Sequence, residues 1–481
     1  MSLVQLQIAL SLIMLPFFSV AQGQGNVWYF GDNAGIDFNT GEPVASLGGQ
    51  VAFSASHSEG SSSICNHDGQ LLFYTNGEKI WNKNHQIMVN GDGLLGSWSS
   101  TQSSLIVPEP DSDTRYFVFT TDGFTLTELQ NGFRYSIVDM CLDEDNGAVL
   151  SDFKNIHLLD TVAEKLVAVR HFNETDYWIV VHKYWSNAFH AFLLTADGLT
   201  DEVISNVGYI HEDNSPSSMS SAIGQMKISS DGGRLTLCIS NRNPTLFEVF
   251  DFDNSTGTVS NSIQIPTNGL GTVYGVEFSP DNSKLYLGAA QDGIFQVDLS
   301  AGNDIAVINS VQLIADPMDK HIFGLQLGPD GKIYAANSGD TKLGVVNYPN
   351  NPGLSCDYSA DQISLNGKEC SYGLPSFIAG YDYSATGVCD TGVRINEVNL
   401  KEISLRVFPN PSSHSIRVEV QDSRFQLQSF TITNMLGHAV LHQKTTANEN
   451  NIDVSGLASG LYTVAATFEN GQTARRRLVV H

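Results

Sequence analysis

The sequence predicts an all-β protein: a seven-bladed β-propeller followed by a small C-terminal β-sandwich. Three observations lead to this prediction. The 481 residues include 43 Gly, 25 Phe and 16 Tyr, a composition that suits short strands joined by tight turns. A strand–turn–strand pattern returns six times between residues 50 and 380. Residues 403–481 then carry a separate and compact series of short strand patterns.

Each copy of the repeat has an apolar strand, a polar turn and a second apolar strand rich in aromatic residues. Turn pairs such as Asp68-Gly69 and Asp330-Gly331 supply the backbone conformations that close a hairpin. The turns recur every 45 to 60 residues, a spacing that suits a four-stranded propeller blade. Each blade is a small sheet with two apolar faces, so it must stack on its neighbours. The copies occupy residues 63–74, 104–119, 166–181, 226–237, 276–287 and 325–335.

The seventh blade is expected to combine strands from both ends of this region. Asn26–Gly31 and Gly35–Phe38 supply strands from the start, and Gly373–Gly380 supplies a late strand. A ring closed in this way leaves no exposed sheet edge. Rings of six or eight blades also fit the spacing.

The first residues are typical of an export signal. Ile8–Val20 is an apolar run of 13 residues, and no charged side chain occurs before Asp32. The run is too short to cross a bilayer, which takes about 20 residues, but it fits the apolar core of a signal peptide. The small residues before Gln22 predict cleavage after Ala21, so residues 1–21 are the expected signal. A buried apolar strand is the alternative, and no other stretch is long and apolar enough for a transmembrane helix.

The charge of the chain is strongly negative. The whole sequence carries a net charge of −26, and residues 1–402 hold 46 acidic and only 18 basic side chains. Such a surface repels polyphosphates, so nucleic acid is not expected as a partner. A solvated surface that keeps an extracellular protein soluble explains the charge. A basic partner or bound cations are the alternatives.

Export changes how the six cysteines are interpreted, because a disulfide persists outside the cytosol. Cys356 and Cys370 lie close together in a stretch rich in Asn, Pro, Gly and Ser, and we expect them to form a disulfide. Cys65 and Cys238 lie in or beside apolar strand patterns, which favours buried free thiols. The pairing of all cysteines other than Cys356 and Cys370 stays open.

No catalytic residues and no cofactor are predicted. The sequence lacks the G-x-S-x-G, H-E-x-x-H and phosphate-loop motifs. His171, His182 and His190 alternate with aromatic residues, as ordinary sheet residues do. Asp143–Gly147 and Asp251–Gly257 resemble calcium loops but lack the EF-hand spacing. Hairpin turns account for both, and calcium is the alternative, so the metal content stays unknown.

Two features of the propeller region resemble known families. Phe278-Ser279-Pro280-Asp281 and Leu327–Gly331 resemble the repeat of secreted bacterial seven-bladed propellers of the lactonase and YVTN-like kind. The opening Trp28–Phe38 resembles propeller regions of large adhesion and gliding-associated surface proteins. Those families include both enzymes and binding modules, so the resemblance does not settle the activity.

We expect a non-catalytic, monomeric module that binds an extracellular glycan or protein. Trp81, Trp98 and Trp185 are candidate stacking anchors for such a ligand, although core packing explains each equally well. The alternative is a secreted hydrolase or lactonase-like enzyme with a site at the propeller axis. That enzyme would need several inward carboxylates or histidines converging near the axis.

The C-terminal pattern has specific landmarks. They are Pro409, Asn410 and Pro411 after a strand, Gly437 after the next apolar strand, then Asp453, Gly460 and Tyr462 before a basic, apolar end. Their order and spacing closely resemble the type A sorting domain of the type IX secretion system of Bacteroidota. The resemblance covers about 75 residues.

The resemblance implies an immunoglobulin-like sandwich over residues 403–481 that engages the type IX secretion machinery. Residues 22–383 are then the propeller and 384–402 the linker. It also implies an extracellular or outer-membrane surface location, after which the tail is usually removed. An ordinary immunoglobulin-like adhesive module is the alternative.

Overall fold

The structure is a computed structural model. It describes residues 23–51, 58–124, 129–200, 202–212, 221–240, 245–267, 269–316 and 320–380, and, in the tail, residues 405–408, 410, 412–420, 427–434, 439–445, 447, 449–458, 460–468 and 473–480. These residues belong to two compact units, one within Met1–Cys389 and one within Asp390–His481. The predicted signal peptide, the cleavage residues Ala21 and Gln22, and the linker 384–402 lie outside the described residues.

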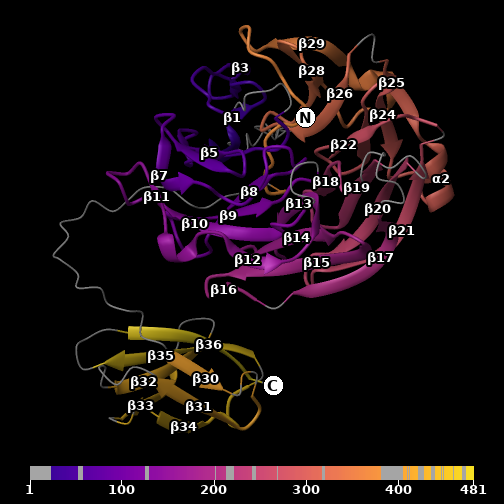
Figure 1. Ribbon diagram of the computed structural model, residues 1–481. Helices are drawn as coiled ribbons and strands as arrows, with labels where there is room; N and C mark the ends of the chain where they lie inside the picture. Colours follow the sequence, from indigo (N-terminus) through magenta and orange to yellow (C-terminus); the bar gives the residue numbers. More distant parts are fainter. Residues whose placement is uncertain are drawn as a thin grey trace, which may run out of the picture. The chain divides into compact units, whose positions relative to one another are not determined.

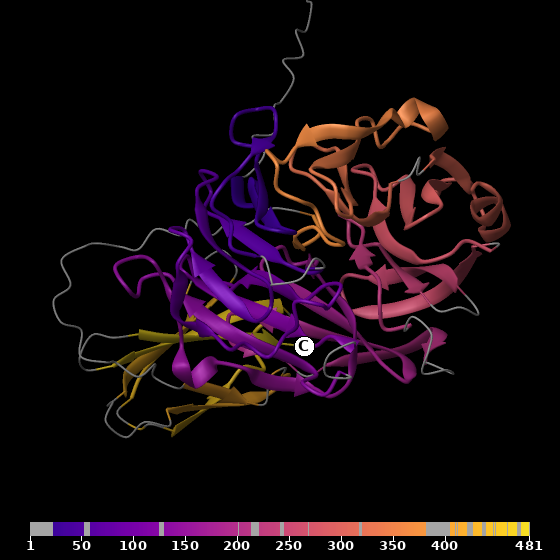
Figure 2. The same cartoon turned by 45° about the horizontal axis from the view of Figure 1, so that its top comes forward.

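The first unit is a ring of seven blades, numbered here in chain order (Figures 1 and 2). Blades 2 and 3 are joined by one parallel pairing of Val89 with Ala148. Blades 1 to 3 contain β1 (Val27–Phe30), β2 (Ala34–Asp37) and β3 (Val44–Ala45); β4 (Ser62–Cys65), β5 (Leu71–Thr75), β6 (Lys79–Asn82) and β7 (Ile87–Asp92); β8 (Ser104–Pro108), β9 (Arg115–Thr121), β10 (Phe133–Asp139), β11 (Ala148–Val149) and β12 (Ile156–Leu159).

The remaining blades are mainly antiparallel meanders of four strands. Blades 4 and 5 contain β13 (Val162–Arg170), β14 (Tyr177–Lys183), β15 (Ser186–Thr195), β16 (Gly198–Leu199) and β17 (Val203–His211); β18 (Met226–Ile228), β19 (Arg234–Ser240), β20 (Thr245–Asp253) and β21 (Thr258–Pro266). Blades 6 and 7 contain β22 (Val273–Phe278), β23 (Lys284–Ala289), β24 (Gly293–Asp298) and β25 (Gln312–Ala315); β26 (Ile322–Leu327), β27 (Ile333–Asn337), β28 (Lys342–Val346) and β29 (Tyr358–Ser364). Short helical turns accompany them: η1 (Gly23–Gly25), η2 (Ser151–Phe153), α2 (Asp304–Asn309) and η3 (Gly353–Cys356).

The predicted turns close their hairpins by local hydrogen bonds. In the β22–β23 turn, the Asp281 carboxylate accepts bonds from the Ser279 hydroxyl at 2.7 Å and the Ser283 amide at 3.0 Å. In the β18–β19 turn, Asp231 accepts the equivalent bonds from the Ser229 hydroxyl and the Gly233 amide, at 2.6 and 3.0 Å. These side chains replace bonds that the strands cannot supply at the turn. The sequence prediction of repeated hairpins is therefore confirmed in both blades.

Aromatic packing closes the ring between blades 7 and 1. The Trp28 ring lies 5.4 Å from Tyr334 of β27 and 5.5 Å from Phe377, measured between ring centroids. All three belong to one buried cluster that joins residues of β1 and β2 to residues of β27 and β28. Blade 1 is thus held by burial of apolar side chains, and Figure 1 shows the two ends of the ring side by side.

The expectation that Gly373–Gly380 forms a strand of blade 1 is wrong. Blade 1 consists of β1, β2 and β3 alone, and the later segment makes isolated bridges from Pro375 to Ser61 and from Ala379 to Val169. This segment, residues 372–380, is called the axial segment below. It contacts blades 2, 4 and 7 through backbone hydrogen bonds to Ser61, Ala168 and Gly324. Pro375 lacks an N–H group, so it cannot take part in a regular ladder.

Polar side chains fill the centre of the ring and bind the free edges of the innermost strands. The Gln102 carbonyl oxygen accepts the Met226 amide at 2.8 Å, which ties blade 3 to blade 5. The Gln225 carbonyl oxygen accepts the amides of Val276 at 3.2 Å and Leu325 at 3.0 Å, which ties blade 5 to blades 6 and 7. Unpaired strand edges are costly when buried. Polar side chains at the axis therefore satisfy inner-strand backbone amides and join both adjacent and non-adjacent blades of the ring.

The second unit contains two sheets, as the C-terminal strand patterns predicted. One sheet holds β30 (Leu405–Phe408), β31 (Ser415–Val420) and β34 (Glu449–Asp453); the other holds β33 (Ala439–Lys444), β32 (Leu427–Asn434), β35 (Gly460–Phe468) and β36 (Thr473–Val480). Side chains from both sheets share one buried cluster, including Val418, Phe430 and Val464. The unit is a small β-sandwich with its own core.

Candidate functional site

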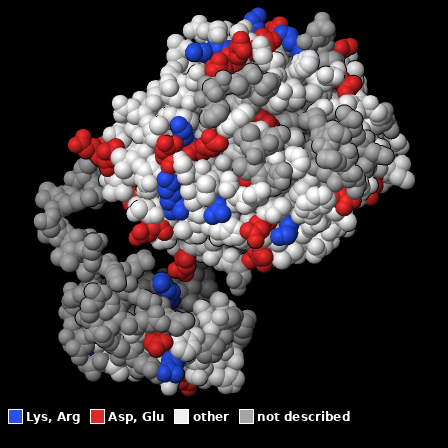
Figure 3. All heavy atoms as spheres, viewed as in Figure 1, with Lys and Arg blue, Asp and Glu red and all other residues white. Residues whose placement is uncertain are grey.

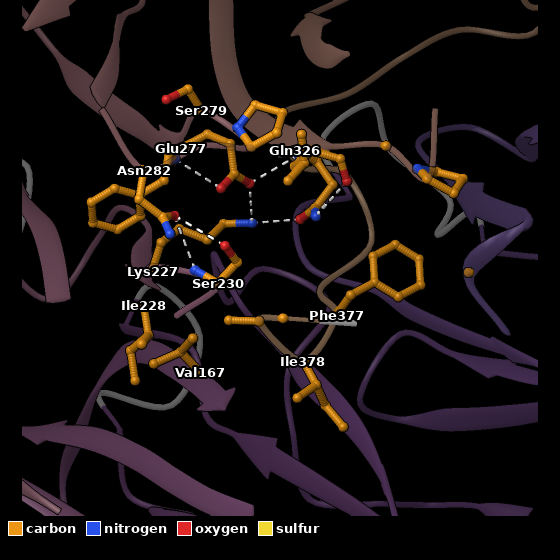
Figure 4. A pocket seen from close by; sticks show the side chains of 18 of the residues that line it. Val167, Lys227, Ile228, Ser230, Glu277, Ser279, Asn282, Gln326, Phe377 and Ile378 are labelled. Atoms are coloured by element: carbon orange, nitrogen blue, oxygen red, sulfur yellow. Dashed lines mark hydrogen bonds and ion pairs between the residues drawn. The ribbon is translucent and has the colours of Figure 1, made fainter. Parts of the chain in front are cut away.

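A cavity of about 550 Å³ opens at one end of the propeller axis (Figure 4). Its walls come from the innermost strands of blades 4 to 7, from the turns that follow these strands in blades 5 to 7, from blade 1 with the turn η1 before it, and from the axial segment. We call this the downstream end, because the innermost strands finish there. The described lining residues are Gly25, Trp28, Val167, Lys227, Ile228, Ser230, Glu277, Phe278, Ser279, Pro280, Asn282, Gln326, Leu327, Gly328, Pro329, Phe377, Ile378, Ala379 and Gly380.

Three neighbouring blades place a polar residue at the same position of their innermost strand. Lys227, Glu277 and Gln326 each stand two residues before the turn that follows the strand. The Lys227 ammonium lies 2.9 Å from a Glu277 oxygen and donates to the Gln326 carbonyl oxygen at 2.5 Å. The Lys227 and Glu277 side chains are only 8% and 7% exposed. Burial makes this pairing obligatory, because neither charge could remain alone there.

The hydrogen-bond acceptors of this group are already engaged. One Glu277 oxygen accepts the Phe278 amide at 2.9 Å, and the other also accepts the Leu327 amide at 3.0 Å. At the rim, the Asn282 side-chain oxygen accepts both the amide and the hydroxyl of Ser230, at 3.2 and 3.1 Å. Figure 4 shows these bonds on one side of the cavity.

The opposite side of the cavity is apolar. Val167, Ile228, Phe377 and Ile378 line it, and all four are buried. Figure 4 places them across the cavity from Lys227 and Gln326. A ligand here would meet N–H groups on one side and hydrocarbon on the other, the usual composition of a small-molecule site.

The upstream end, where the innermost strands begin, holds two buried carboxyl groups. Glu59 accepts the Tyr274 hydroxyl at 2.6 Å and the Ser99 hydroxyl at 3.2 Å. Glu164 accepts the Phe124 amide at 2.8 Å and both the amide and the hydroxyl of Thr101 at 2.9 Å. Burial, together with the nearby Glu164 charge, raises the pKa of Glu59 well above its ordinary value. Burial also raises the pKa of Glu164, although hydrogen bonds from Phe124 and Thr101 oppose the rise.

Three buried bases lie beside this pair. The His182 and His211 rings stack with their centroids 3.8 Å apart. Lys165 donates to the backbone oxygens of Ala222 and Ile223 at 2.9 Å. Burial lowers the pKa of His182 to about 3 and that of Lys165 to about 8, and it holds the pKa of His211 well below its ordinary value. Burial at the upstream end therefore shifts the pKa of each of these groups toward its uncharged form.

The candidate stacking tryptophans lie apart from the cavity. Trp81 is buried and stacks on Tyr74 with centroids 5.4 Å apart, so it is a core residue. Trp98 is half-buried in the segment between β7 and β8. Trp185, in the β14–β15 turn, is 59% exposed and has a φ of 60°, which is rare for so bulky a residue. None of the three lines the cavity.

The expected disulfide between Cys356 and Cys370 does not form. Both are free, buried thiols, as are Cys65 and Cys238. Cys356 packs with Tyr286 and its neighbours beneath blades 6 and 7, whereas Cys370 packs in the Trp28 cluster that closes the ring. The two cysteines are close in sequence, but their side chains are buried in different apolar clusters. Cys141 is disulfide-bonded.

The candidate metal ligands of the sequence are dispersed in the fold. His190 bonds Glu202 at 2.8 Å, His171 accepts the Asn173 amide at 3.1 Å, and His182 stacks on His211. The two calcium-like segments, Asp143–Gly147 and Asp251–Gly257, lie largely in turns that follow β10 and β20. Within the described residues, no three His, Cys, Asp or Glu side chains are grouped to hold a metal ion. No described helix is long and apolar enough to cross a membrane.

The landmark residues of the C-terminal pattern lie at strand ends. Asn410 accepts the Val479 amide at 2.8 Å, and Asp453 accepts the amide and hydroxyl of Ser455 at 2.9 and 2.6 Å. Gly460 begins β35, and the Tyr462 hydroxyl donates to the Ala458 oxygen at 2.7 Å. These bonds fix the turns that join the two sheets. The remaining landmarks, Pro409, Pro411 and Gly437, lie outside the described residues.

The sequence analysis did not identify the polar residues at the downstream and upstream ends of the propeller axis. One signal for Lys227, Glu277 and Gln326 was present, since aligning the repeats places all three at one position of an otherwise apolar strand. No comparable signal marks Glu59 and Glu164, because they precede the strand patterns or interrupt them singly.

Comparison with known proteins identifies the second unit. Residues 406–481 match the family described as the secretion system C-terminal sorting domain. No curated protein matches the chain. A functionally unknown protein from Desulfotomaculum acetoxidans DSM 771 is 12% identical, with 82% of this chain and 99% of that chain covered and a TM-score of 0.36. Hydrazine synthase of Kuenenia stuttgartiensis is also 12% identical, with 70% and 95% covered and a TM-score of 0.37.

The C-terminal unit is therefore a type IX sorting domain, as its landmarks indicated. It directs the chain to the extracellular space or the outer-membrane surface. The ligand or substrate must accordingly be sought in the first unit.

Proposed function

We propose that the exported propeller is a non-catalytic binding module for an extracellular glycan or protein. The observation that supports this proposal is the downstream cavity, whose charged groups neutralise each other. Lys227 and Glu277 are paired at 2.9 Å, and both oxygens of Glu277 accept backbone amides. Both carboxylate oxygens of Glu277 are thus occupied by donors of the protein, which leaves this side chain poorly placed to act on a substrate.

The other lining residues also favour binding over catalysis. The Ser279 hydroxyl donates to Asp281 in its own turn, and the Ser230 hydroxyl donates to Asn282. The described lining residues contain no His or Cys that could activate a nucleophile. Amide, hydroxyl and apolar groups remain, and these recognise a ligand without transforming it.

A blocked-cavity variant tests this function. Ser230 lies exposed at the rim, so Ser230→Tyr places a ring in the opening without disturbing the core. The exposed Ser260 of β21 lies outside the lining, so Ser260→Tyr is the matched control. Purified full-length protein would be screened on arrays of glycans and surface proteins, and each hit measured by calorimetry. We expect Ser230→Tyr to weaken binding at least tenfold and Ser260→Tyr to leave it unchanged; equal binding by both would overturn the proposal.

A second candidate function is a hydrolase with its site at the upstream end. The pair of buried carboxyls favours it, since the pKa of Glu59 is raised as a general acid requires. Tyr274 would hold Glu59 in place through their 2.6 Å hydrogen bond. Hydrolysis of glycosides or lactones that is lost in Glu59→Gln and retained in Ser230→Tyr would support this candidate. Absence of turnover in the unmodified protein would reject it.

A further inference from the structure

We infer that the downstream cavity binds an N-acetylated amino sugar, holding its acetamido group between the N–H donors of Lys227, Gln326 and Asn282 and the apolar wall opposite. This inference rests on the proposed binding function and names its ligand class. It follows from the hydrogen-bonding capacity left in the cavity, its charge, its apolar wall and its size.

Lys227, Gln326 and Asn282 each keep an unused N–H donor toward the cavity. The Lys227 ammonium has three N–H bonds and uses two of them, on Glu277 and Gln326. The Gln326 amide nitrogen has two and uses one, on the Leu327 oxygen at 3.1 Å. The Asn282 amide nitrogen donates to no residue in the described part of the chain, while its oxygen is engaged by Ser230. A ligand must therefore present acceptors, because a buried donor left unpaired is costly.

The charge of the site favours a neutral acceptor. Lys227 and Glu277 cancel each other, so a carboxylate or phosphate would lose its hydration without meeting a net positive charge. The net charge of −26 on the whole chain adds a general repulsion of anions. Figure 3 shows acidic side chains spread over the visible face of the propeller. A carbonyl oxygen fulfils the requirement, because it accepts two hydrogen bonds and carries no charge.

The apolar wall accounts for the rest of the group. Val167, Ile228 and Ile378 offer a buried hydrocarbon surface opposite the donors. An acetamido group carries its carbonyl oxygen and its methyl group on the same carbon, so it satisfies both walls at once. A hydroxyl has no methyl group, and an unacetylated amine would bring a further positive charge beside Lys227.

The size of the cavity favours a sugar over an acetylated peptide side chain. A volume of about 550 Å³ lies within the range of small-molecule sites and far exceeds an acetyl group. The ring of a sugar would occupy the remaining space, with Phe377 on one side and the Ser230 and Asn282 rim on the other.

Three matched oligosaccharides test the inference by calorimetry on the purified full-length protein. They are the β1,4-linked tetramers of N-acetylglucosamine, of glucosamine and of glucose. We expect the acetylated tetramer to bind at least tenfold more tightly than either of the others. Asn282→Gly should weaken that binding three- to tenfold, whereas Asn261→Gly should not change it. Both asparagines have a positive φ, 58° and 49°, so glycine fits each backbone and only Asn282 lines the cavity.

The failures of the two proposals are distinguishable. Equal binding of the glucose and N-acetylglucosamine tetramers in the cavity would overturn the acetamido inference and leave the binding function standing. Tighter binding of an acetyl-lysine peptide than of the sugar would overturn the choice of a glycan. Binding of the acetylated tetramer that Ser230→Tyr does not weaken would overturn the inference, because the sugar would then bind elsewhere. A protein that binds none of the tetramers but binds an array protein through the cavity would overturn the inference alone.

Discussion

The two ends of the propeller axis use buried polar groups in opposite ways. At the downstream end, charges of opposite sign neutralise each other across two blades, and N–H donors remain beside a cavity. At the upstream end, like-charged carboxyls and stacked histidines are enclosed, and their pKa values shift toward the uncharged forms. The comparison shows that a closed ring of blades needs polar side chains along its axis. How these side chains pair with one another decides whether hydrogen-bonding groups remain for a ligand.

The cause lies in the free edges of the innermost strands. Near the upstream end and the middle, Glu164, Gln102 and Gln225 accept hydrogen bonds from backbone amides of other blades. At the downstream end, Lys227 and Glu277 pair with each other, and both also bind blade 7, Glu277 through the Leu327 amide and Lys227 through the Gln326 side chain. The upstream end is therefore expected to serve stability, and the downstream end recognition.

The largest expected effect comes from breaking the downstream ion pair. Lys227→Met leaves the Glu277 carboxylate buried without its partner, which typically costs about 3–5 kcal/mol. Urea unfolding followed by tryptophan fluorescence measures this loss of stability. The double variant Lys227→Met/Glu277→Leu should recover most of it, since a buried ion pair and an apolar pair are often equally stable. A double variant as unstable as the single one would show that the pair contributes more than mutual neutralisation.

The axial segment gives the next largest effect. A Cβ atom at Gly373 would lie 2.0 Å from the Glu59 backbone oxygen, so Gly373→Ala must displace either the segment or Glu59. Overpacking of this kind costs about 1–3 kcal/mol, and we expect the upper part of that range. At Gly271 the nearest group to a new Cβ is Asp292 at 3.4 Å, which makes Gly271→Ala the control. Equal stability of the two variants in urea unfolding would contradict the assignment of the segment as a tie between blades.

Local chemistry made much of this fold predictable. Turn sequences around Asp231 and Asp281 form the expected hairpins, because the carboxylate and its neighbours close the turn without distant contacts. The described part of the tail forms seven strands, as the series of short strand patterns over residues 403–481 predicted. In β36, the consecutive Arg475, Arg476 and Arg477 break the alternation of apolar and polar residues that usually indicates a strand.

The features that the sequence did not predict share one physical origin, because each depends on contacts between segments that are distant in the sequence. Gly373–Gly380 has the composition of a strand, but its backbone pairs with the inner edges of two different blades, at Ser61 and at Val169. Cys356 and Cys370 are near in sequence, yet separate apolar clusters bury each of them. β13 begins at Val162, before the repeat copy expected from residue 166, and its Glu164 and Lys165 are satisfied by blades 3 and 5.

The pH dependence of stability should arise at the upstream end. The pKa of His182 is lowered from 6.5 to about 3, so the unfolded chain binds more protons as the pH falls from 6.5 toward 3, and stability falls with it. The raised pKa of Glu59 acts in the other direction: its contribution is present below 4.5 and is lost as the pH rises through the higher folded value. Each group contributes up to about 1.4 kcal/mol per pH unit. Urea unfolding between pH 4 and 8 should show a shallower acid slope in His182→Phe and a shallower alkaline slope in Glu59→Gln, and unchanged slopes would contradict this origin.

The smallest expected effect on stability comes from removing a single serine hydroxyl at either end of the axis. Ser99 is buried and donates to Glu59 at 3.2 Å, so Ser99→Ala leaves a carboxyl oxygen with one partner fewer and should cost about 0.5–1.5 kcal/mol. Ser230 donates to Asn282 at 3.1 Å from an exposed position, where water replaces the lost bond, so Ser230→Ala should change stability by less than about 0.5 kcal/mol. The same pair should reverse its order in ligand binding, because Ser230→Ala leaves the Asn282 oxygen with the residue-230 amide as its partner and so holds the Asn282 side chain less firmly. If Ser99→Ala instead weakened binding without loss of stability, recognition would belong to the upstream end, and the functions assigned to the two ends would have to be exchanged.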